Sequence, residues 1–319
     1  MKRRGRAAAF GMAAVVLIGI WAAVLGGEAE APKTAAATAA ATAAAPVAAP
    51  AVRKGTWKGF ERHDLVVDGC RAIVVVPKEA ASGKPWIWRA MFFDHKPDVD
   101  QALVAKGFHL AYIEVGNTFG CPDALKHWDA FYQFLTKEYG LAPRAVLEGV
   151  SRGGLYCYNW AADNPDKVAC IFGDAPVCDF KSWPGGKGKG KGSPKDWEKC
   201  RKDYHFATEA EALAYAKNPV DNLKPLAEAN IPIIHLCGDA DDVVPVEENT
   251  KIIEERYRKL GGLVKVIIKK GVGHVHSLVP PDPIVDFILQ NMGRAASGVA
   301  GTAACRQGGY PAAWAAQYP

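Results

Sequence analysis

The sequence predicts an α/β fold with a mostly parallel central sheet that has helices on both faces. Short apolar, β-branched runs alternate with longer helix-like segments from residue 85 to residue 291, which is typical of parallel strands joined by helical crossovers. Two further runs, LVVDG and CRAIVVVP over residues 65–77, precede this alternation and favour an antiparallel hairpin. We therefore expect a sheet that begins antiparallel and continues parallel.

Each later element follows from its own pattern of apolar residues. Short apolar runs that end at turn residues predict buried strands over 85–93, 109–115, 144–150, 167–173, 231–238 and 264–270. Apolar residues at helical spacing predict helices over 98–106, 122–139, 153–164, 208–217, 247–260 and 282–291. In such a sheet the loops at the carboxyl ends of the strands carry the functional groups.

Both ends of the chain differ in composition from its middle. Basic residues within the first six positions precede an uncharged, mostly apolar run over residues 7–27, which is the arrangement of a secretory signal. Export to the periplasm or the medium is therefore expected, and an uncleaved membrane anchor with the folded part facing outward is the alternative. The expected parts are a signal or anchor over residues 1–31, an Ala/Thr/Pro-rich linker over 32–52, the folded domain over 53–293 and a low-complexity tail over 294–319.

The positive charge of the chain is concentrated in one segment. The formal net charge is +5, and residues 181–202 alone hold eight cations and two anions. Because the basicity is a local patch, nucleic acid is not an expected partner, and a membrane is a partner only through the N-terminal anchor.

The strand expected over residues 144–150 leads directly into Gly149-Val150-Ser151-Arg152-Gly153, and a helix is expected immediately afterwards. This strand, turn and helix form the context of a G-x-S-x-G nucleophile elbow, in which small residues let the serine hydroxyl project above the sheet. Ser151 is therefore the candidate nucleophile.

A serine hydroxyl becomes a good nucleophile only when a base accepts its proton and an acid orients that base. Asp239, Asp241 and Asp242 follow the strand expected over residues 231–238, and His274 and His276 follow the last expected strand. The order serine, aspartate, histidine along the chain is the order used by this class of fold.

Residues 57–292 resemble the α/β-hydrolases, in particular the branch that contains prolyl-oligopeptidase-like domains and secreted carbohydrate esterases. That branch places its acid in a Gly-x-x-Asp-x-x-Val-Pro motif and its histidine in a Gly-x-Gly-His loop. The matching positions are Gly238, Asp241, Val244 and Pro245 for the acid, and Gly271, Gly273 and His274 for the histidine. The resemblance implies an α/β-hydrolase fold with about eight strands and a lid insertion.

The resemblance also implies a catalytic triad of Ser151, His274 and Asp241. It favours Asp241 over Asp242 as the acid. It favours His274 over His276 as the base, which leaves His276 as a wall of the pocket or a surface residue. His235, inside a strand, is expected to be a hydrogen-bonded core residue.

An oxyanion hole requires two N–H donors directed at the developing negative charge. The backbone N–H of Arg152, the residue after the nucleophile, is the expected first donor. The second is expected from Phe93 or Asp94 in the loop FFDHKPD, although this loop lacks the His-Gly pair found in many related enzymes.

The segment SWPGGKGKGKGSPKDW over residues 182–197 approaches a phosphate-binding loop, but Gly192 follows Lys191 where such a loop needs serine or threonine. The repeat also lacks a strand directly before it and a clear helix directly after it, so a nucleotide site is not expected. A lid over residues 178–207 and a flexible solvated loop are the two interpretations. In a lid, Trp183 and Trp197 would stack on sugars, and Lys187, Lys189 and Lys191 would attract an anionic substrate.

Eight cysteines in an exported chain permit disulfide bonds. Cys170 and Cys237 lie in apolar strands and are expected to be buried thiols, whereas a Cys178–Cys200 bridge at the base of the lid is a hypothesis. No pair of histidines has the spacing of metal ligands beside a free carboxylate, so neither a metal nor another cofactor is expected.

The function these observations favour is that of an exported serine esterase that cleaves acyl or methyl esters on a polysaccharide through an acyl-enzyme. A small-molecule ester is the other expected type of substrate, and the lysines of residues 187–191 favour an anionic one. A serine peptidase of prolyl-oligopeptidase type is the enzymatic alternative. A non-catalytic glycan-binding protein on a hydrolase scaffold is the alternative from another class.

Overall fold

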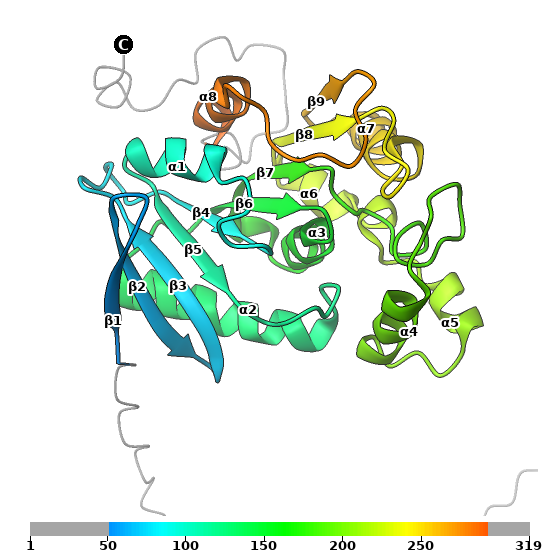
Figure 1. The fold of residues 1–319 in the computed structure, drawn as a ribbon, viewed down its shortest axis with the longest axis horizontal. Helices are drawn as coiled ribbons and strands as arrows, with labels where there is room; N and C mark the ends of the chain where they lie inside the picture. The colour runs from blue at the N-terminus through cyan, green and yellow to red at the C-terminus, as the bar shows by residue number, and fades with distance from the viewer. Residues whose placement is uncertain (1–50, 293–319) are drawn as a thin grey trace, which may run out of the picture. The chain divides into compact units, whose positions relative to one another are not determined.

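The computed structural model describes residues 51–292 (Figure 1). The expected signal or anchor, most of the linker and the C-terminal tail lie outside these residues. Within the described range, no helix combines the length and the apolar character that crossing a membrane requires.

The core of the fold is a nine-stranded sheet in the order β1-β2-β3-β5-β4-β6-β7-β8-β9 (Figure 1). The strands are β1 (Arg53–Trp57), β2 (Phe60–Val67), β3 (Cys70–Val76), β4 (Trp86–Arg89), β5 (His109–Ile113), β6 (Ala145–Val150), β7 (Val168–Asp174), β8 (Ile233–Gly238) and β9 (Val264–Lys269). Pairs up to β3–β5 are antiparallel and every later pair is parallel, which confirms the predicted α/β fold.

The antiparallel strands are joined by two tight turns. Asp68 and Gly69 connect β2 to β3, and Lys58 and Gly59 connect β1 to β2, with positive φ at all four residues. Positive φ at both central residues is the requirement of a type I′ hairpin turn. The sequence did not predict β1, because only Trp57 among its residues is buried and no apolar alternation marks the strand.

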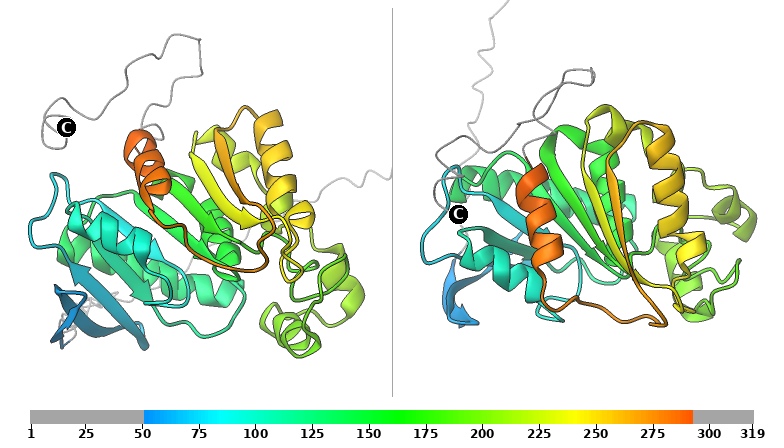
Figure 2. Two further views of the ribbon diagram at one scale, coloured as in Figure 1. Left: turned by 45° about the horizontal axis from the view of Figure 1, so that its top comes forward. Right: turned by 90° about the horizontal axis from the view of Figure 1, so that it is seen from above.

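Helices cover both faces of the sheet, as expected. They are α1 (Asp98–Ala105), α2 (Pro122–Phe134), α3 (Gly153–Asp163), α4 (Pro194–Asp203), α5 (Glu209–Ala214), α6 (Lys224–Glu228), α7 (Thr250–Lys259) and α8 (Asp282–Asn291). Buried residues of α1 and α8 form one core with one face of the sheet, whereas those of α2, α3 and α7 form the other core (Figures 1 and 2).

The larger core contains a cluster of tryptophans that supports the strands at the site. Trp88 of β4 stacks on Trp128 of α2 with ring centroids 4.2 Å apart, and Trp160 of α3 packs edge-on to Trp88 at 5.1 Å. Such aromatic pairs stabilise a core beyond the area that they bury. They fix α2 and α3 against β4, beside β6, the strand that leads into Ser151.

All seven cysteines of residues 51–292 are free thiols. Cys170 and Cys237 are buried, as predicted, and burial raises the pKa of the Cys237 thiol to about 11. The hypothesis of a Cys178–Cys200 bridge is wrong, since both are free and each is buried in the apolar core. Apolar packing, and not a disulfide bond, therefore holds the base of the insertion between β7 and β8, residues 175–232.

Candidate active site

Ser151 lies in a sharp turn between β6 and α3. Its φ of 51° falls in the left-handed region, which is strained for a residue with a side chain. The flanking glycines allow the turn: a Cβ at Gly149 would lie 2.9 Å from the Gly154 backbone, and a Cβ at Gly154 would lie 2.6 Å from the Val177 carbonyl oxygen. The turn thus has the geometry expected of a nucleophile elbow.

The structure brings Ser151, His274 and Asp241 into one hydrogen-bonded chain. The Ser151 hydroxyl lies 3.0 Å from Nε2 of His274, and Nδ1 of His274 lies 2.7 Å from Oδ2 of Asp241. The three residues follow β6, β9 and β8, whose carboxyl ends lie at the same edge of the sheet. In this arrangement the imidazole accepts a proton from the serine while the carboxylate fixes its orientation.

Asp241 and Asp242, the two candidates for the catalytic acid, have different environments in the loop after β8. The Asp241 side chain is fully buried, and its Oδ1 accepts the backbone N–H groups of Val243 at 2.9 Å and Val244 at 2.8 Å. Asp242 is exposed and pairs with Lys191 at 2.6 Å, which lowers the pKa of its carboxyl. Of the two candidates, only Asp241 faces His274.

His276 and His235 occupy two different environments. The His276 side chain is 11% exposed, its ring lies 4.8 Å from that of His274, and its Nδ1 is 3.4 Å from Asp174. His276 thus lines the immediate surroundings of the triad. His235 is fully buried between the hydroxyls of Tyr158 and Thr250, and burial lowers its pKa to about 3. The prediction of a hydrogen-bonded core histidine is confirmed.

The side chains of Phe93 and Asp94 contact other residues, and the role of their backbone N–H groups in the oxyanion hole stays a prediction. The Phe93 ring packs against Trp57 and Tyr112 in the smaller core, and the Asp94 carboxylate accepts the Trp57 indole N–H. The predicted strand was too long: β4 ends at Arg89, so the loop beside the elbow begins earlier in the sequence.

The backbone of the loop residue Met91 lies next to the elbow. Its nitrogen is 3.7 Å from the position of a Cβ on Gly153, the residue two places after the nucleophile. The N–H of Met91 is therefore a further candidate for the second donor beside those of Phe93 and Asp94, and we propose that it acts together with the N–H of Arg152.

Arg89, a residue that the sequence did not single out, holds this loop. Its side chain is fully buried, and its Nε donates to the carbonyls of Met91 at 3.2 Å and Phe92 at 3.1 Å, while Nη2 donates to that of His95 at 2.5 Å. Three carbonyls of one loop are thus bound to one guanidinium, which fixes the conformation of the loop.

Two buried carboxyl groups surround the Arg89 guanidinium. Nη1 donates to Asp100 of α1 and, at 2.9 Å, to Glu148 of β6, three residues before Ser151. Burial raises the pKa of Glu148 well above its usual range, which favours its neutral form beside the Arg89–Asp100 ion pair. This cluster connects the elbow strand, the loop after β4 and α1.

Trp183 and Trp197 are not the exposed sugar-stacking pair that the sequence suggested. Each is only 7% exposed within the larger core. Trp183 packs on Phe119, and Trp197 packs on Phe180 and donates its indole N–H to Glu209. The apolar residues of the insertion between β7 and β8, the two tryptophans among them, belong to this same core.

The Gly-Lys segment, residues 185–192, has neither the sequence of a phosphate-binding loop nor the freedom of a fully solvated loop. The N–H of Lys191 donates to the carbonyl of Asp242 at 3.0 Å, and that of Lys189 donates to Glu248. A Cβ at Gly188 would overlap the Glu248 carboxylate, so this glycine permits the close approach. The segment is therefore anchored to the loop that carries Asp241.

Two of the three predicted substrate-attracting lysines are already paired. Lys187 forms an ion pair with Glu209 at 2.5 Å, and Lys191 forms one with Asp242 at 2.6 Å. Among residues 51–292, no carboxylate pairs with the ammonium group of Lys189. The net positive field of the segment is therefore smaller than its sequence suggests.

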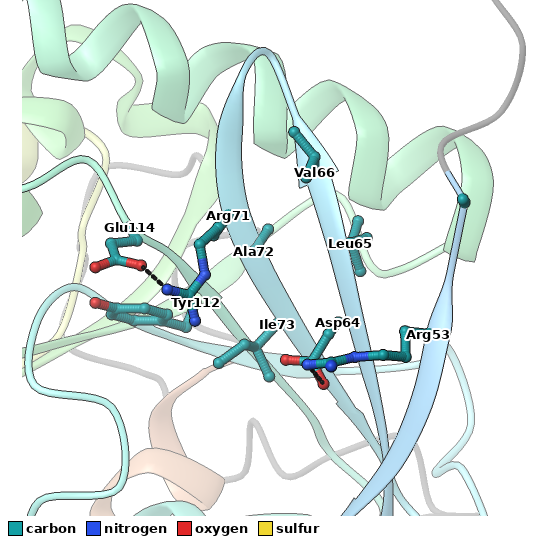
Figure 3. Close-up of a pocket in the computed structure, with 10 residues that line it drawn as sticks. Arg53, Asp64, Leu65, Val66, Arg71, Ala72, Ile73, Tyr112 and Glu114 are labelled. Atoms are coloured by element: carbon teal, nitrogen blue, oxygen red, sulfur yellow. Dashed lines mark ion pairs between the residues drawn. The ribbon is translucent and has the colours of Figure 1, made fainter.

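A pocket of about 230 Å³ lies apart from this site, on strands β2, β3 and β5 (Figure 3). Its charged lining residues pair with one another, Arg71 with Glu114 at 3.6 Å and Arg53 with Asp64 at 3.8 Å. None of the triad residues lines this pocket.

Comparison with known proteins identifies the family. A model of the prolyl oligopeptidase family matches residues 118–286, over half of the chain, and this range includes Ser151, Asp241 and His274. No curated protein matches the chain.

Solved structures of hydrolases share the fold. A puromycin hydrolase aligns with a TM-score of 0.52 and 18% identity over 79% of this chain and 40% of that protein. An acylaminoacyl peptidase of Pyrococcus horikoshii aligns with a TM-score of 0.52 and 15% identity, over 76% of this chain and 42% of the peptidase. This chain thus spans less than half the length of these two hydrolases.

An esterase of Pyrococcus furiosus is similar over nearly its whole length. It aligns with a TM-score of 0.54 and 17% identity over 76% of this chain and 99% of the esterase. The sheet, the hydrogen-bonded serine, histidine and aspartate that it carries, and the match to the family model lead to one conclusion: this chain belongs to the prolyl oligopeptidase family.

Proposed function

We propose that this protein is an exported serine esterase that removes acyl or methyl ester groups from a polysaccharide through an acyl-enzyme at Ser151. The observation that carries the catalytic part is the hydrogen-bonded chain from Ser151 through His274 to the buried Asp241. A protein that only binds glycans does not need a serine, a histidine and an aspartate in this hydrogen-bonded arrangement. The arrangement therefore favours catalysis.

The geometry supports a two-step reaction. Ser151 Oγ attacks the ester carbonyl carbon while His274 Nε2 accepts its proton, and the oxyanion receives the N–H groups of Arg152 and Met91. His274 then donates the proton to the leaving alcohol as the carbon–oxygen bond breaks. Water attacks the acyl-enzyme with His274 as base, the acid is released, and the proton returns to Ser151. Asp241 keeps the imidazole oriented throughout.

The preference for esters over peptides rests on the size of the shared fold. The esterase of Pyrococcus furiosus consists almost entirely of the part that aligns with this chain, whereas the puromycin hydrolase and the acylaminoacyl peptidase are more than half unaligned. The aligned fold alone therefore suffices for an esterase. A peptidase is the second candidate, because several of the similar structures are peptidases.

The ester and peptide alternatives are separated by matched substrates with one acyl group. The quantity to compare is the ratio of kcat/KM for the 4-nitrophenyl ester of an N-blocked amino acid to kcat/KM for the 4-nitroanilide of the same acid. Esters are intrinsically more reactive than anilides, so a well-characterised serine peptidase provides the reference ratio. We expect this protein to have a larger ratio than the peptidase. A ratio equal to that of the peptidase would instead support peptide hydrolysis. Release of acetate, methanol or ferulate from the corresponding glycans, absent in Ser151→Ala, would identify the ester class.

The proposal of export rests on the composition of residues 1–31. A signal leaves the folded domain in the periplasm or the medium, and an uncleaved anchor leaves it on the outer face of the membrane. Recovery of the protein only from the cytoplasmic fraction of its host would contradict this part of the proposal.

A further inference from the structure

The guanidinium of Arg152, the residue after the nucleophile, lies among aromatic rings from the loop after β4, the loop after β5 and the insertion between β7 and β8. Arg152 follows Ser151 directly, and its guanidinium carbon is 4.6 Å from the ring centroid of Trp183, 5.7 Å from that of Phe92 and 6.0 Å from that of Phe119. Cation–π contacts hold a guanidinium in place without consuming its N–H donors. The aromatic rings therefore hold the guanidinium in place and leave its N–H donors available.

Most of the donors of Arg152 are unused. Among residues 51–292 its ion-pair partner is Asp196 of α4, at an Nη1–Oδ1 distance of 3.8 Å, which is longer than a hydrogen bond. The Nε atom is buried and has no hydrogen-bond partner. An unpaired buried donor is costly, and a guanidinium offers five N–H groups in a planar fork.

Asp196 only partly neutralises Arg152. The Asp196 carboxylate already accepts hydrogen bonds from the Asn117 amide at 3.0 Å and from the Ser193 hydroxyl at 2.7 Å. By contrast, Lys187 and Lys191 of the Gly-Lys segment form close ion pairs with carboxylates. The ammonium group of Lys189 also lacks a carboxylate partner among residues 51–292, but Lys189 is exposed, whereas Arg152 is partly buried and directly follows Ser151.

The position of Arg152 in α3 adds to this positive charge. Arg152 is the N-cap residue of α3, and the N-terminus of a helix carries a partial positive charge that disfavours a cation. The guanidinium and the helix N-terminus together create a positive potential next to Ser151, which an anionic ligand would relieve. With 22% of its side chain exposed, Arg152 is accessible to such a ligand.

We propose that Arg152 binds a carboxylate of the substrate, so that the substrate is an ester of an acidic glycan with a free uronate close to the sugar that bears the ester. A carboxylate matches the fork of a guanidinium and can accept two parallel N–H groups. The inference rests on the proposed function, and it replaces the lysine segment by Arg152 as the main anion-binding group.

Direct binding to the full chain with Ser151→Ala tests this inference without turnover. Isothermal titration calorimetry would compare a galacturonate trisaccharide, a neutral galactose trisaccharide and a sulfated galactose trisaccharide. We expect the galacturonate ligand to bind about tenfold or more tightly than the neutral one, because charge-assisted hydrogen bonds to a guanidinium provide at least that difference.

A second substitution assigns the preference to its residue. Adding Arg152→Gln to the Ser151→Ala chain should abolish the preference for galacturonate, and Arg152→Lys should retain only part of it. Lys187→Gln is the matched control, because Lys187 is already paired with Glu209, and it should retain the preference. Thermal unfolding of each variant would show that it is folded.

Equal binding of the galacturonate and neutral ligands would overturn the inference, and so would a galacturonate preference that survives Arg152→Gln. Equal binding of the sulfated and galacturonate ligands would also overturn it, because it would indicate a general anion site. Reaction of the wild-type chain with a fluorophosphonate keeps the two proposals apart. Labelled protein without a galacturonate preference contradicts only this inference, whereas unlabelled folded protein contradicts the proposed function.

Discussion

At the scale of single residues, hydrogen bonds distinguish the catalytic candidates from their neighbours in sequence. Asp241 and Asp242 are adjacent, but one is buried with two backbone donors and the other is exposed and paired with Lys191. The motif Gly-x-x-Asp-x-x-Val-Pro was sufficient to prefer Asp241. The start of the loop that follows β4 could not be predicted, because β4 ends at Arg89 whereas the apolar run continues past that point.

The two histidines of the last loop should differ strongly in their effect on turnover. His274→Ala removes the base, and we expect it to lower kcat/KM for 4-nitrophenyl acetate by about a thousandfold or more. His276→Ala removes a ring that only contacts His274, and we expect a loss smaller than about tenfold. A loss as large for His276→Ala as for His274→Ala would contradict the assignment of the base.

At the scale of elements, the segments that local patterns describe were predicted and those that depend on distant contacts were not. The strands and helices around Ser151 follow from apolar periodicity. Helix α4 was missed because its sequence PKDWEKCRKD is mostly charged and only Trp197 and Cys200 are buried. The glycines of the Gly-Lys segment indicated flexibility, whereas they permit contact with Glu248 and Pro245.

The loop after β4 depends on Arg89, and substitutions there should affect catalysis more than binding. Lysine retains the charge of Arg89 but cannot reach three carbonyls and a carboxylate with one ammonium group. We expect Arg89→Lys to remain folded, to lower kcat about tenfold and to change KM less. Glu148→Gln is the matched control, because an amide resembles a neutral carboxylic acid, and it should keep kcat within about threefold of the wild type.

The kcat values of Arg89→Lys and Glu148→Gln should be expressed per active site, with the active sites counted by titration with a fluorophosphonate. The thermal midpoint of unfolding of each variant should be measured as well. A purely structural role of Arg89 predicts a lower midpoint with an unchanged kcat per titrated site. That result would contradict its role in positioning the oxyanion loop.

At the scale of the whole molecule, the topology of the sheet brings together three loops that are far apart in sequence. Ser151, Asp241 and His274 follow β6, β8 and β9, and the parallel direction of these strands was predicted from the alternation of strands and helices. Two features of the insertion between β7 and β8 were not predictable: the burial of Trp183 and Trp197, and the free, buried thiols of Cys178 and Cys200. These side chains become buried only when the insertion packs on the rest of the fold.

The central claim is that Ser151 is a nucleophile activated by His274 and Asp241, and labelling with a fluorophosphonate tests it most directly. The probe forms a covalent bond only with an activated serine, and mass spectrometry of the digested protein locates the adduct. We predict one adduct, on Ser151, that forms much more slowly in His274→Ala and is absent in Ser151→Ala. Folded wild-type protein that stays unlabelled, or an adduct that persists in Ser151→Ala, would contradict the claim.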